Sequence, residues 1–176
     1  MPNIVTATRT VASVAIGLAG VASERPVLIL VAYAVYWIGD IADGWLARRL
    51  GQETRLGAVF DIISDRACAA VLCVAVVAHT PRMSVVVGVF LLTFLVLDAM
   101  LSLAFLCFPI DTPNHFWRID RTVYRLNWSP LAKATNTAGV VGAIALGAHT
   151  LGLVIGLAVL AIKVWSTARV LRLLDA

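Results

Sequence analysis

Charged residues are scarce in this sequence. Only 14% of its 176 residues are Asp, Glu, Lys or Arg, roughly half the share found in an ordinary soluble domain. Hydrophobic residues make up 61% of the chain, and the mean hydropathy is +0.93. Such a chain lacks the polar residues that would cover a soluble surface. We therefore expect an all-α, polytopic integral membrane protein forming a single domain over residues 1–176.

Cysteine is scarce as well. Cys68, Cys73 and Cys107 form no C-x-x-C pair and lie in apolar stretches, which favours packing over a redox or metal-binding role. The net charge of +4 would favour nucleic acid in a soluble protein. In so apolar a chain we interpret it as charge at a membrane surface, and we expect no nucleic-acid partner. The apolar run after Arg9 is not followed by a convincing small-x-small cleavage site, so we expect a retained first helix rather than a signal peptide.

Long polar linkers are also absent, and short breakers divide the apolar runs. Each run has roughly the 20 residues that a membrane helix needs. Arg118, Arg121 and Arg125 recur at helical spacing between Trp117 and Trp128, which predicts a short amphipathic helix lying in the membrane interface. The six predicted transmembrane helices are residues 3–22, 27–50, 56–78, 84–108, 130–148 and 151–174.

The few acidic residues are concentrated in one segment. Asp40 and Asp43 are three residues apart, and Asp61 and Asp65 are four apart, so each pair lies on one face of a helix. The polar turn over residues 48–55 lets the two helices run antiparallel, so that the pairs face each other. A carboxylate in a bilayer costs about 3 kcal/mol, and four that converge repel one another unless cations lie between them.

Hard divalent cations such as Mg²⁺ take oxygen ligands and usually keep positions for substrate phosphates. The acidic pairs therefore predict a metal site at the membrane surface, built for a substrate that carries phosphate. The competing interpretation is a set of buried ion pairs between these aspartates and Arg48, Arg49 or Arg66. A further alternative, from another class of function, is a cation transporter or channel. It predicts polar residues along a whole transmembrane path, whereas here they crowd at one end.

Basic residues predict the orientation. Six helices leave both termini on one side of the membrane. If the turn between the acidic pairs is cytoplasmic, only Arg25 and Arg82 lie at the opposite side, and Lys163 lies within the last helix. We therefore expect the aspartates and both termini at the cytoplasmic face of the cell (inner or plasma) membrane. The basic residues at the cytoplasmic ends are Arg9, Arg48, Arg49, Arg55, Arg66, Arg118, Arg121, Arg125, Lys133, Arg169 and Arg172.

The acidic segment resembles the signature of the CDP-alcohol phosphatidyltransferase family. The pattern D-x2-D-G-x2-A-R-x8-G-x3-D-x3-D is matched without a gap by Asp40, Asp43, Gly44, Ala47, Arg48, Gly57, Asp61 and Asp65. The resemblance implies transfer of a phosphatidyl group from CDP-diacylglycerol to an alcohol, with release of CMP, in phospholipid synthesis by a homodimer. It also implies two Mg²⁺ ions, with Mn²⁺ as an alternative. Asp40, Asp43 and Asp61 would be the main metal ligands, and Asp65 would contact the second metal and act as general base.

The resemblance extends to the nucleotide. The segment Pro2-Asn3-Ile4-Val5-Thr6, followed by Arg9, resembles the P-N-x-x-T-x-x-R start of many family members, in which Asn3, Ile4, Val5 and Thr6 would help to recognise cytidine. Gly44 would let the nucleotide approach the helix, Arg48 would hold a phosphate, and Thr54 matches a hydroxyl position that contacts the nucleotide.

The acceptor alcohol is less strongly indicated. A basic cluster at the cytoplasmic mouth suits a phosphorylated alcohol, and glycerol 3-phosphate is our first choice. Inositol phosphate and phosphatidylglycerol, as in a cardiolipin synthase, are the alternatives, because D-I-I-S-D-R stands here in place of the D-P-x-A-D-K of many glycerophosphate-using members. The candidate acceptor residues are Arg118, Arg121, Arg125, Lys133 and Arg169. Two charges within helices remain: Asp98 is expected to pair with Arg169 or Lys133 or to serve structure, and Lys163 to snorkel.

Overall fold

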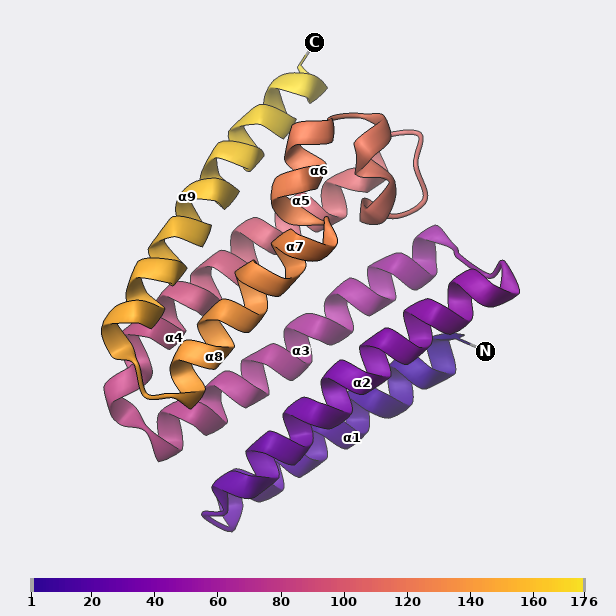
Figure 1. Cartoon of the computed structure of the whole chain (residues 1–176). Helices are drawn as coiled ribbons and strands as arrows, with labels where there is room; N and C mark the ends of the chain where they lie inside the picture. Colours follow the sequence, from indigo (N-terminus) through magenta and orange to yellow (C-terminus); the bar gives the residue numbers. More distant parts are fainter. Residues whose placement is uncertain (1, 176) are drawn as a thin grey trace. The chain divides into compact units, whose positions relative to one another are not determined.

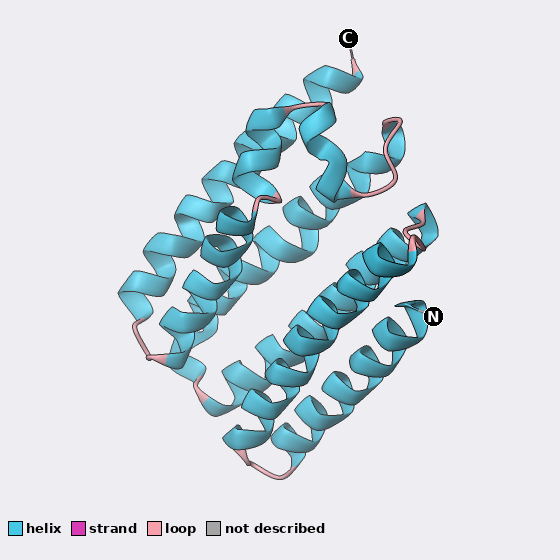
Figure 2. Cartoon of the chain, turned by 45° about the vertical axis from the view of Figure 1, so that its right-hand side comes forward, coloured by secondary structure: helices cyan, strands magenta, loops and turns pink. Residues whose placement is uncertain are grey.

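The computed structural model describes residues 2–175, and these residues are mostly helical, with turns and loops between the helices and no strand among them (Figure 2). The all-α prediction is thus confirmed. The chain divides into two compact units, the first ending at Pro81 and the second beginning at Arg82. Each unit has its own buried residues and is described separately below. The expectation of one domain over the whole chain stays a prediction.

Three long helices form the first unit: α1 (Pro2–Ala22), α2 (Pro26–Leu50) and α3 (Arg55–His79). In Figure 1 they lie side by side, and α1 packs against both of the others. The predicted boundaries of all three lie within one residue of the observed ones. Their apolar core consists of Ile29, Ala32, Tyr36, Cys68, Leu72 and Ala75.

Local sequence explains where these helices begin and end. Pro26 occupies the first turn of α2, where its missing N–H costs nothing. Gly51 ends α2 with φ of 60°, a left-handed conformation that suits glycine, and the next N–H, that of Gln52, bonds to the Ala47 carbonyl at 3.0 Å. The Thr54 hydroxyl then caps α3 by accepting a hydrogen bond from the Gly57 N–H at 3.0 Å. The turn that joins the two acidic pairs therefore spans only four residues, 51–54.

The buried face of α1 is made of small and polar residues rather than large apolar ones. Its buried residues are Pro2, Thr6, Arg9, Ser13, Gly17 and Gly20. They recur every three or four positions and so form one stripe along the helix. The Ser13 hydroxyl donates to the Ala32 carbonyl of α2 at 2.9 Å. Small residues on this stripe let the helices approach closely, as is typical of packing within a membrane.

The second unit begins at Arg82, within the helical segment Pro81–Cys107. This segment contains α4 (Ser84–Leu91) and α5 (Ala99–Leu103), joined by the π-helical segment η2 (Leu92–Asp98), with the 3₁₀ segments η1 (Pro81–Met83) and η3 (Ala104–Cys107) at its ends. After it come η4 (Pro113–Arg118), α6 (Arg121–Asn127), α7 (Pro130–Lys133), the π-helical η5 (Ala134–Ala138), α8 (Gly139–Ala145) and α9 (His149–Leu174).

Polar contacts connect α9 to the rest of this unit. Lys163 is 3% exposed and donates to Asp98 at the end of η2. The prediction that Lys163 snorkels is therefore wrong, because its ammonium group is buried against a carboxylate. One turn further along α9, the Ser166 hydroxyl accepts a hydrogen bond from the Asn127 side chain at 2.9 Å, and Arg169 donates to Asp120.

Among the described residues, four helices are long and apolar enough to cross a membrane: Pro2–Ala22, Pro26–Leu50, Pro81–Cys107 and His149–Leu174. The other two predicted spans, residues 56–78 and 130–148, are not among these four. Helix α3 carries four charged residues in its first half, and the stretch from α7 to α8 is interrupted by η5. The predicted interfacial helix forms two short helices, η4 and α6. Six spans and an interfacial position for this segment stay predictions.

Candidate active site

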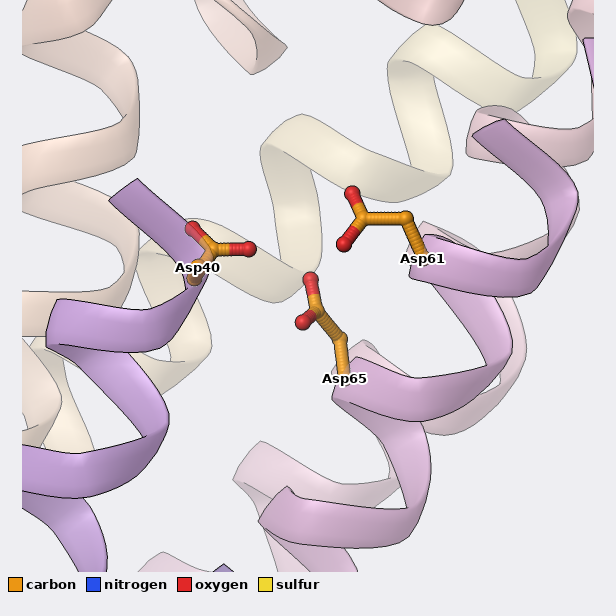
Figure 3. Close-up of side chains that lie close together, drawn as sticks. All are labelled: Asp40, Asp61 and Asp65. Carbon is orange, nitrogen blue, oxygen red and sulfur yellow. The ribbon is translucent and has the colours of Figure 1, made fainter. Parts of the chain in front are cut away.

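Three carboxylates from two helices of the first unit converge on one point. Asp40 projects from α2, and Asp61 and Asp65 from successive turns of α3 (Figure 3). Each offers an oxygen atom, and these atoms all lie within 4.8 Å of one another. The turn at 51–54 and the four-residue spacing on α3 bring about this convergence. Three of the four predicted metal ligands are therefore together. Asp43, on the next turn of α2, completes what we call the acidic cluster.

The guanidinium of Arg9 lies among these carboxylates. Its Nη2 atom is 2.5 Å from an oxygen of Asp61, 3.0 Å from one of Asp65 and 3.3 Å from one of Asp40. Its Nε donates to Asp43 at 2.8 Å. A single side chain of α1 thus contacts all four aspartates and joins the three helices of the unit.

Asp43 differs from the other three aspartates. Its Oδ2 accepts from the Thr6 hydroxyl at 2.8 Å as well as from Arg9. It does not belong to the group whose oxygens lie within 4.8 Å. In this structure Asp43 anchors α1 to α2, and its predicted role as a metal ligand stays a prediction.

Exposure within the cluster follows a gradient. The side chains of Arg9 and Asp43 are 2% and 5% exposed, whereas that of Asp65 is 19% exposed and those of Asp40 and Asp61 are 35% and 40% exposed. Arg9 and Asp43 therefore form the buried floor, and Asp40 and Asp61 form the rim. A molecule that approaches from outside meets the rim carboxylates first.

The donor set fits a hard divalent cation. All ligands on offer are carboxylate oxygens, which Mg²⁺ and Mn²⁺ prefer. The guanidinium of Arg9 satisfies these oxygens incompletely, because its Nη2 atom carries two hydrogens and faces three carboxylate oxygens. Four carboxylates also exceed the charge of Arg9 and of Arg66, the residue after Asp65, so a net negative charge remains when all are ionised. These residues would hold a divalent cation through Asp40, Asp61 and Asp65.

The residues predicted to bind the nucleotide all belong to the first unit, like the acidic cluster. A Cβ added at Gly57 would lie 3.2 Å from Oδ1 of Asn3, so the start of α1 lies beside the first turn of α3. Arg48 folds back over Gly44, where an added Cβ would lie 3.2 Å from its Nη1. Thr54 caps α3. Thr6 is buried against Asp43, whereas Ile4 is exposed. The contacts that these residues would make with a nucleotide stay predictions.

The predicted acceptor residues all belong to the second unit, and all five are exposed. Two of them are tied to the segment before α7: Lys133 donates to Asn114 at 3.0 Å, and Arg169 donates to Asp120, the residue that caps α6. Arg118 lies over the ring of Trp117. Their role toward an acceptor stays a prediction.

Sequence reasoning did not identify the central position of Arg9. Only the competing interpretation paired the aspartates with arginines, and it named Arg48, Arg49 or Arg66, which are near them in sequence. The signal was nevertheless present, since Arg9 is the one charged residue of α1 and shares a helical face with Thr6 and Ser13. A charge on the buried face of a membrane helix requires a partner.

A family model described as CDP-alcohol phosphatidyltransferase matches residues 1–168, nearly the whole chain. Comparison with curated proteins found no match, and comparison with solved structures found none either.

Proposed function

This chain belongs to the CDP-alcohol phosphatidyltransferase family, a family of transferases of substituted phosphate groups, and from that premise we propose that it transfers the phosphatidyl group of CDP-diacylglycerol to a small alcohol. The family itself implies a CDP-alcohol donor and an alcohol acceptor. Our proposal specifies the donor lipid, the divalent cations and the residues that act. Family membership favours this enzyme over the alternative of a cation transporter.

The observation that carries the proposal is the convergence of Asp40, Asp61 and Asp65 within 4.8 Å. Helices of a membrane protein rarely place three carboxylates together without a function for them. When bound there, divalent cations would neutralise the diphosphate and make the attacked phosphorus more electrophilic. The partly exposed rim formed by Asp40 and Asp61 leaves the site accessible to a lipid-linked substrate.

Side chains of the first unit supply the general base and the contacts to the nucleotide. Asp65 takes the proton of the acceptor hydroxyl, provided that this hydroxyl is held in place, because a carboxylate is a weak base in water. A bond forms between the acceptor oxygen and the phosphorus that bears diacylglycerol. The bond from that phosphorus to the bridging oxygen breaks, and CMP leaves. Arg48 binds the nucleotide phosphate, and Asn3 and Thr6 orient the cytidine.

For the acceptor we propose glycerol 3-phosphate. Arg118, Arg121, Arg125, Lys133 and Arg169 are exposed cations, and guanidinium groups bind phosphate through paired hydrogen bonds. Inositol phosphate has the same recognition chemistry and is the first alternative. Phosphatidylglycerol, which carries a phosphodiester, is the second.

The four apolar helices indicate membrane insertion. We propose that the acidic cluster lies at the cytoplasmic face of the cell membrane, as the distribution of basic residues predicts. CMP and glycerol 3-phosphate are soluble and would exchange with the cytosol there. We also propose that the protein works as a homodimer, as the family resemblance implies.

The test is a CMP-release assay with purified protein, CDP-diacylglycerol, Mg²⁺ or Mn²⁺ and each candidate alcohol in turn. We expect release with glycerol 3-phosphate and no release when EDTA removes the cations. Asp65→Asn should lower the rate by at least about 100-fold, the lower range for loss of a general base. Asp175→Asn, an exposed change outside the family match, is the matched control and should keep full activity.

Three outcomes would contradict parts of the proposal separately. Absence of CMP release with every alcohol would refute the reaction. Release with inositol phosphate or phosphatidylglycerol alone would refute only the acceptor. An active Asp65→Asn variant would refute the assignment of the base.

A further inference from the structure

We propose that Arg9 is a resident counter-ion of the acidic cluster. Its guanidinium balances Asp40, Asp61 and Asp65 when no divalent cation is bound, and its Nη2 withdraws from them when one binds. This inference rests on the proposed function, which supplies the divalent cation. It adds a competition, within the chain itself, between an arginine and the metal.

The Nη2 atom of Arg9 lies among the oxygens that would bind a metal. One nitrogen atom lies 2.5–3.3 Å from oxygens of the three carboxylates that also form the candidate metal group. A metal ion bound by the same oxygens would lie about 2.0–2.6 Å from each of them. Two cations cannot share that space, and their charges repel. Binding of a metal by these oxygens therefore requires Nη2 to move.

The guanidinium of Arg9 has one contact that a bound metal would leave in place and one nitrogen without a hydrogen-bond partner among the described residues. Its Nε bond to Asp43 lies outside the candidate metal group and need not break. Its Nη1, in contrast, is buried without a hydrogen-bond partner among the described residues. A buried donor without a partner is costly and calls for an explanation. The guanidinium is held by its hydrogen bonds to the carboxylates of the cluster, and one of its nitrogens remains unsatisfied.

The space for the Arg9 side chain depends on a glycine of α2. A Cβ added at Gly39 would lie 2.5 Å from Cβ and 2.7 Å from Cδ of Arg9, so only glycine leaves room for its stem. The Tyr36 ring lies beneath the guanidinium, 5.5 Å from centroid to Cζ, within the range of a cation–π contact. Helix α2 thus accommodates a cation beside Asp40 independently of any metal.

A purely structural role for Arg9 makes the opposite prediction. If Arg9 only arranges the carboxylates for the metal, its removal weakens metal binding. If Arg9 competes with the metal, its removal strengthens metal binding and at the same time destabilises the metal-free protein, because the carboxylates then repel one another.

The experiment measures both quantities on the purified, full-length protein in detergent. Mn²⁺ affinity is followed by electron paramagnetic resonance, and thermal unfolding is recorded in EDTA and in excess Mn²⁺. For Arg9→Gln we expect a lower Tm in EDTA, a larger rise in Tm on addition of Mn²⁺, and a Kd for Mn²⁺ at least about tenfold lower, which corresponds to about 1.4 kcal/mol. Arg9→Lys, which keeps the charge, should bind Mn²⁺ more weakly than Arg9→Gln.

A Kd for Arg9→Gln equal to or higher than that of the unaltered protein overturns the inference while leaving the proposed function standing. A lack of Mn²⁺ binding by the unaltered protein overturns both. If Arg9→Gln does not fold, ¹⁵N resonances of arginine side chains in the unaltered protein give the answer. The Arg9 signals, assigned by their loss in Arg9→Lys, should shift on addition of Mg²⁺, and unchanged signals would overturn the inference.

Discussion

At the scale of single residues, Asp120 illustrates a carboxylate with two tasks. Its Oδ1 accepts the N–H groups of Thr122 and Val123 at 2.8 and 3.0 Å and so caps α6, while its Oδ2 accepts from Arg169. Burial acts to raise the pKa of Asp120, but the two N–H groups and the guanidinium outweigh it and lower the pKa below its ordinary value. The ionised form is therefore the one that stabilises the fold.

This gives a pH prediction. Because the folded-state pKa of Asp120 is depressed, its contribution is complete above the unfolded pKa of about 4 and is lost as the pH falls through the lower, folded value. Asp120→Asn keeps an N-cap of similar quality but loses the negative charge that faces Arg169, so it should cost about 0.5–1 kcal/mol at neutral pH. The difference from the unaltered protein should shrink below about pH 4. Thermal unfolding in detergent across this range measures it. Asp175→Asn serves as control, and a difference that grows in acid would contradict the assignment.

The residue scale also shows what could be predicted. The spacing of Asp40, Asp61 and Asp65 was sufficient to predict their convergence, because helical periodicity and a short turn fix which faces meet. The contacts of Arg9 were not predicted, because they depend on how α1 packs against α2 and α3. That packing is set by small residues such as Gly39, whose importance appears only when the helices are in contact.

At the scale of elements, the crossing of α1 and α2 depends on Gly39. Gly39→Ala should push the helices apart or displace Arg9, and it should destabilise the protein by about 1–3 kcal/mol, as overpacking does. Thermal unfolding in detergent provides the measurement. Gly88→Ala is the matched control, since it also adds a methyl group to a membrane helix but meets no atom within 4 Å. Equal stability of the two variants would contradict the close contact.

The second element-scale prediction concerns the pair that joins η2 to α9. Lys163→Met leaves the Asp98 carboxylate without this buried partner and should cost about 3–5 kcal/mol. Adding Asp98→Leu should recover most of that loss, because an apolar pair avoids the desolvation of both charges. Stabilities of the two single variants and the double variant form a thermodynamic cycle. A double variant that is as unstable as the sum of the single ones would show that the two side chains act independently.

The π-helical segments η2 and η5 mark the limit of sequence reasoning for the elements. Segment η2 lies in a helix that is apolar on nearly every face, and η5 is a short run of alanine, threonine and asparagine, so in neither does a periodicity distinguish a wider turn from a regular one. The limits of α1, α2 and α3 were predictable because Pro26, Gly51 and Thr54 mark them. Comparable signals are lacking inside the segments 84–108 and 130–148, where the structure departs most from simple helices.

At the scale of the whole molecule, the six-span topology is open to test. In a variant whose native cysteines are replaced, Gln52→Cys, in the turn between α2 and α3, should be labelled by an impermeant thiol reagent only from the cytoplasmic side. Glu24→Cys, in the turn between α1 and α2, should be labelled only from the opposite side. Inside-out and right-side-out vesicles provide the comparison and control each other. Labelling of both positions from one side would contradict the proposed topology.

The position of Arg9 has a consequence for biosynthesis. Arg9 and the four aspartates that it contacts lie at positions 9 to 65. A ribosome therefore completes the arginine before any of its acidic partners. The charge of Arg9 in α1 is then already present to offset part of the cost of each later aspartate, which is about 3 kcal/mol for a lone carboxylate in a bilayer. Arg9 can therefore balance part of the negative charge of the cluster without a metal and without the chain beyond α3.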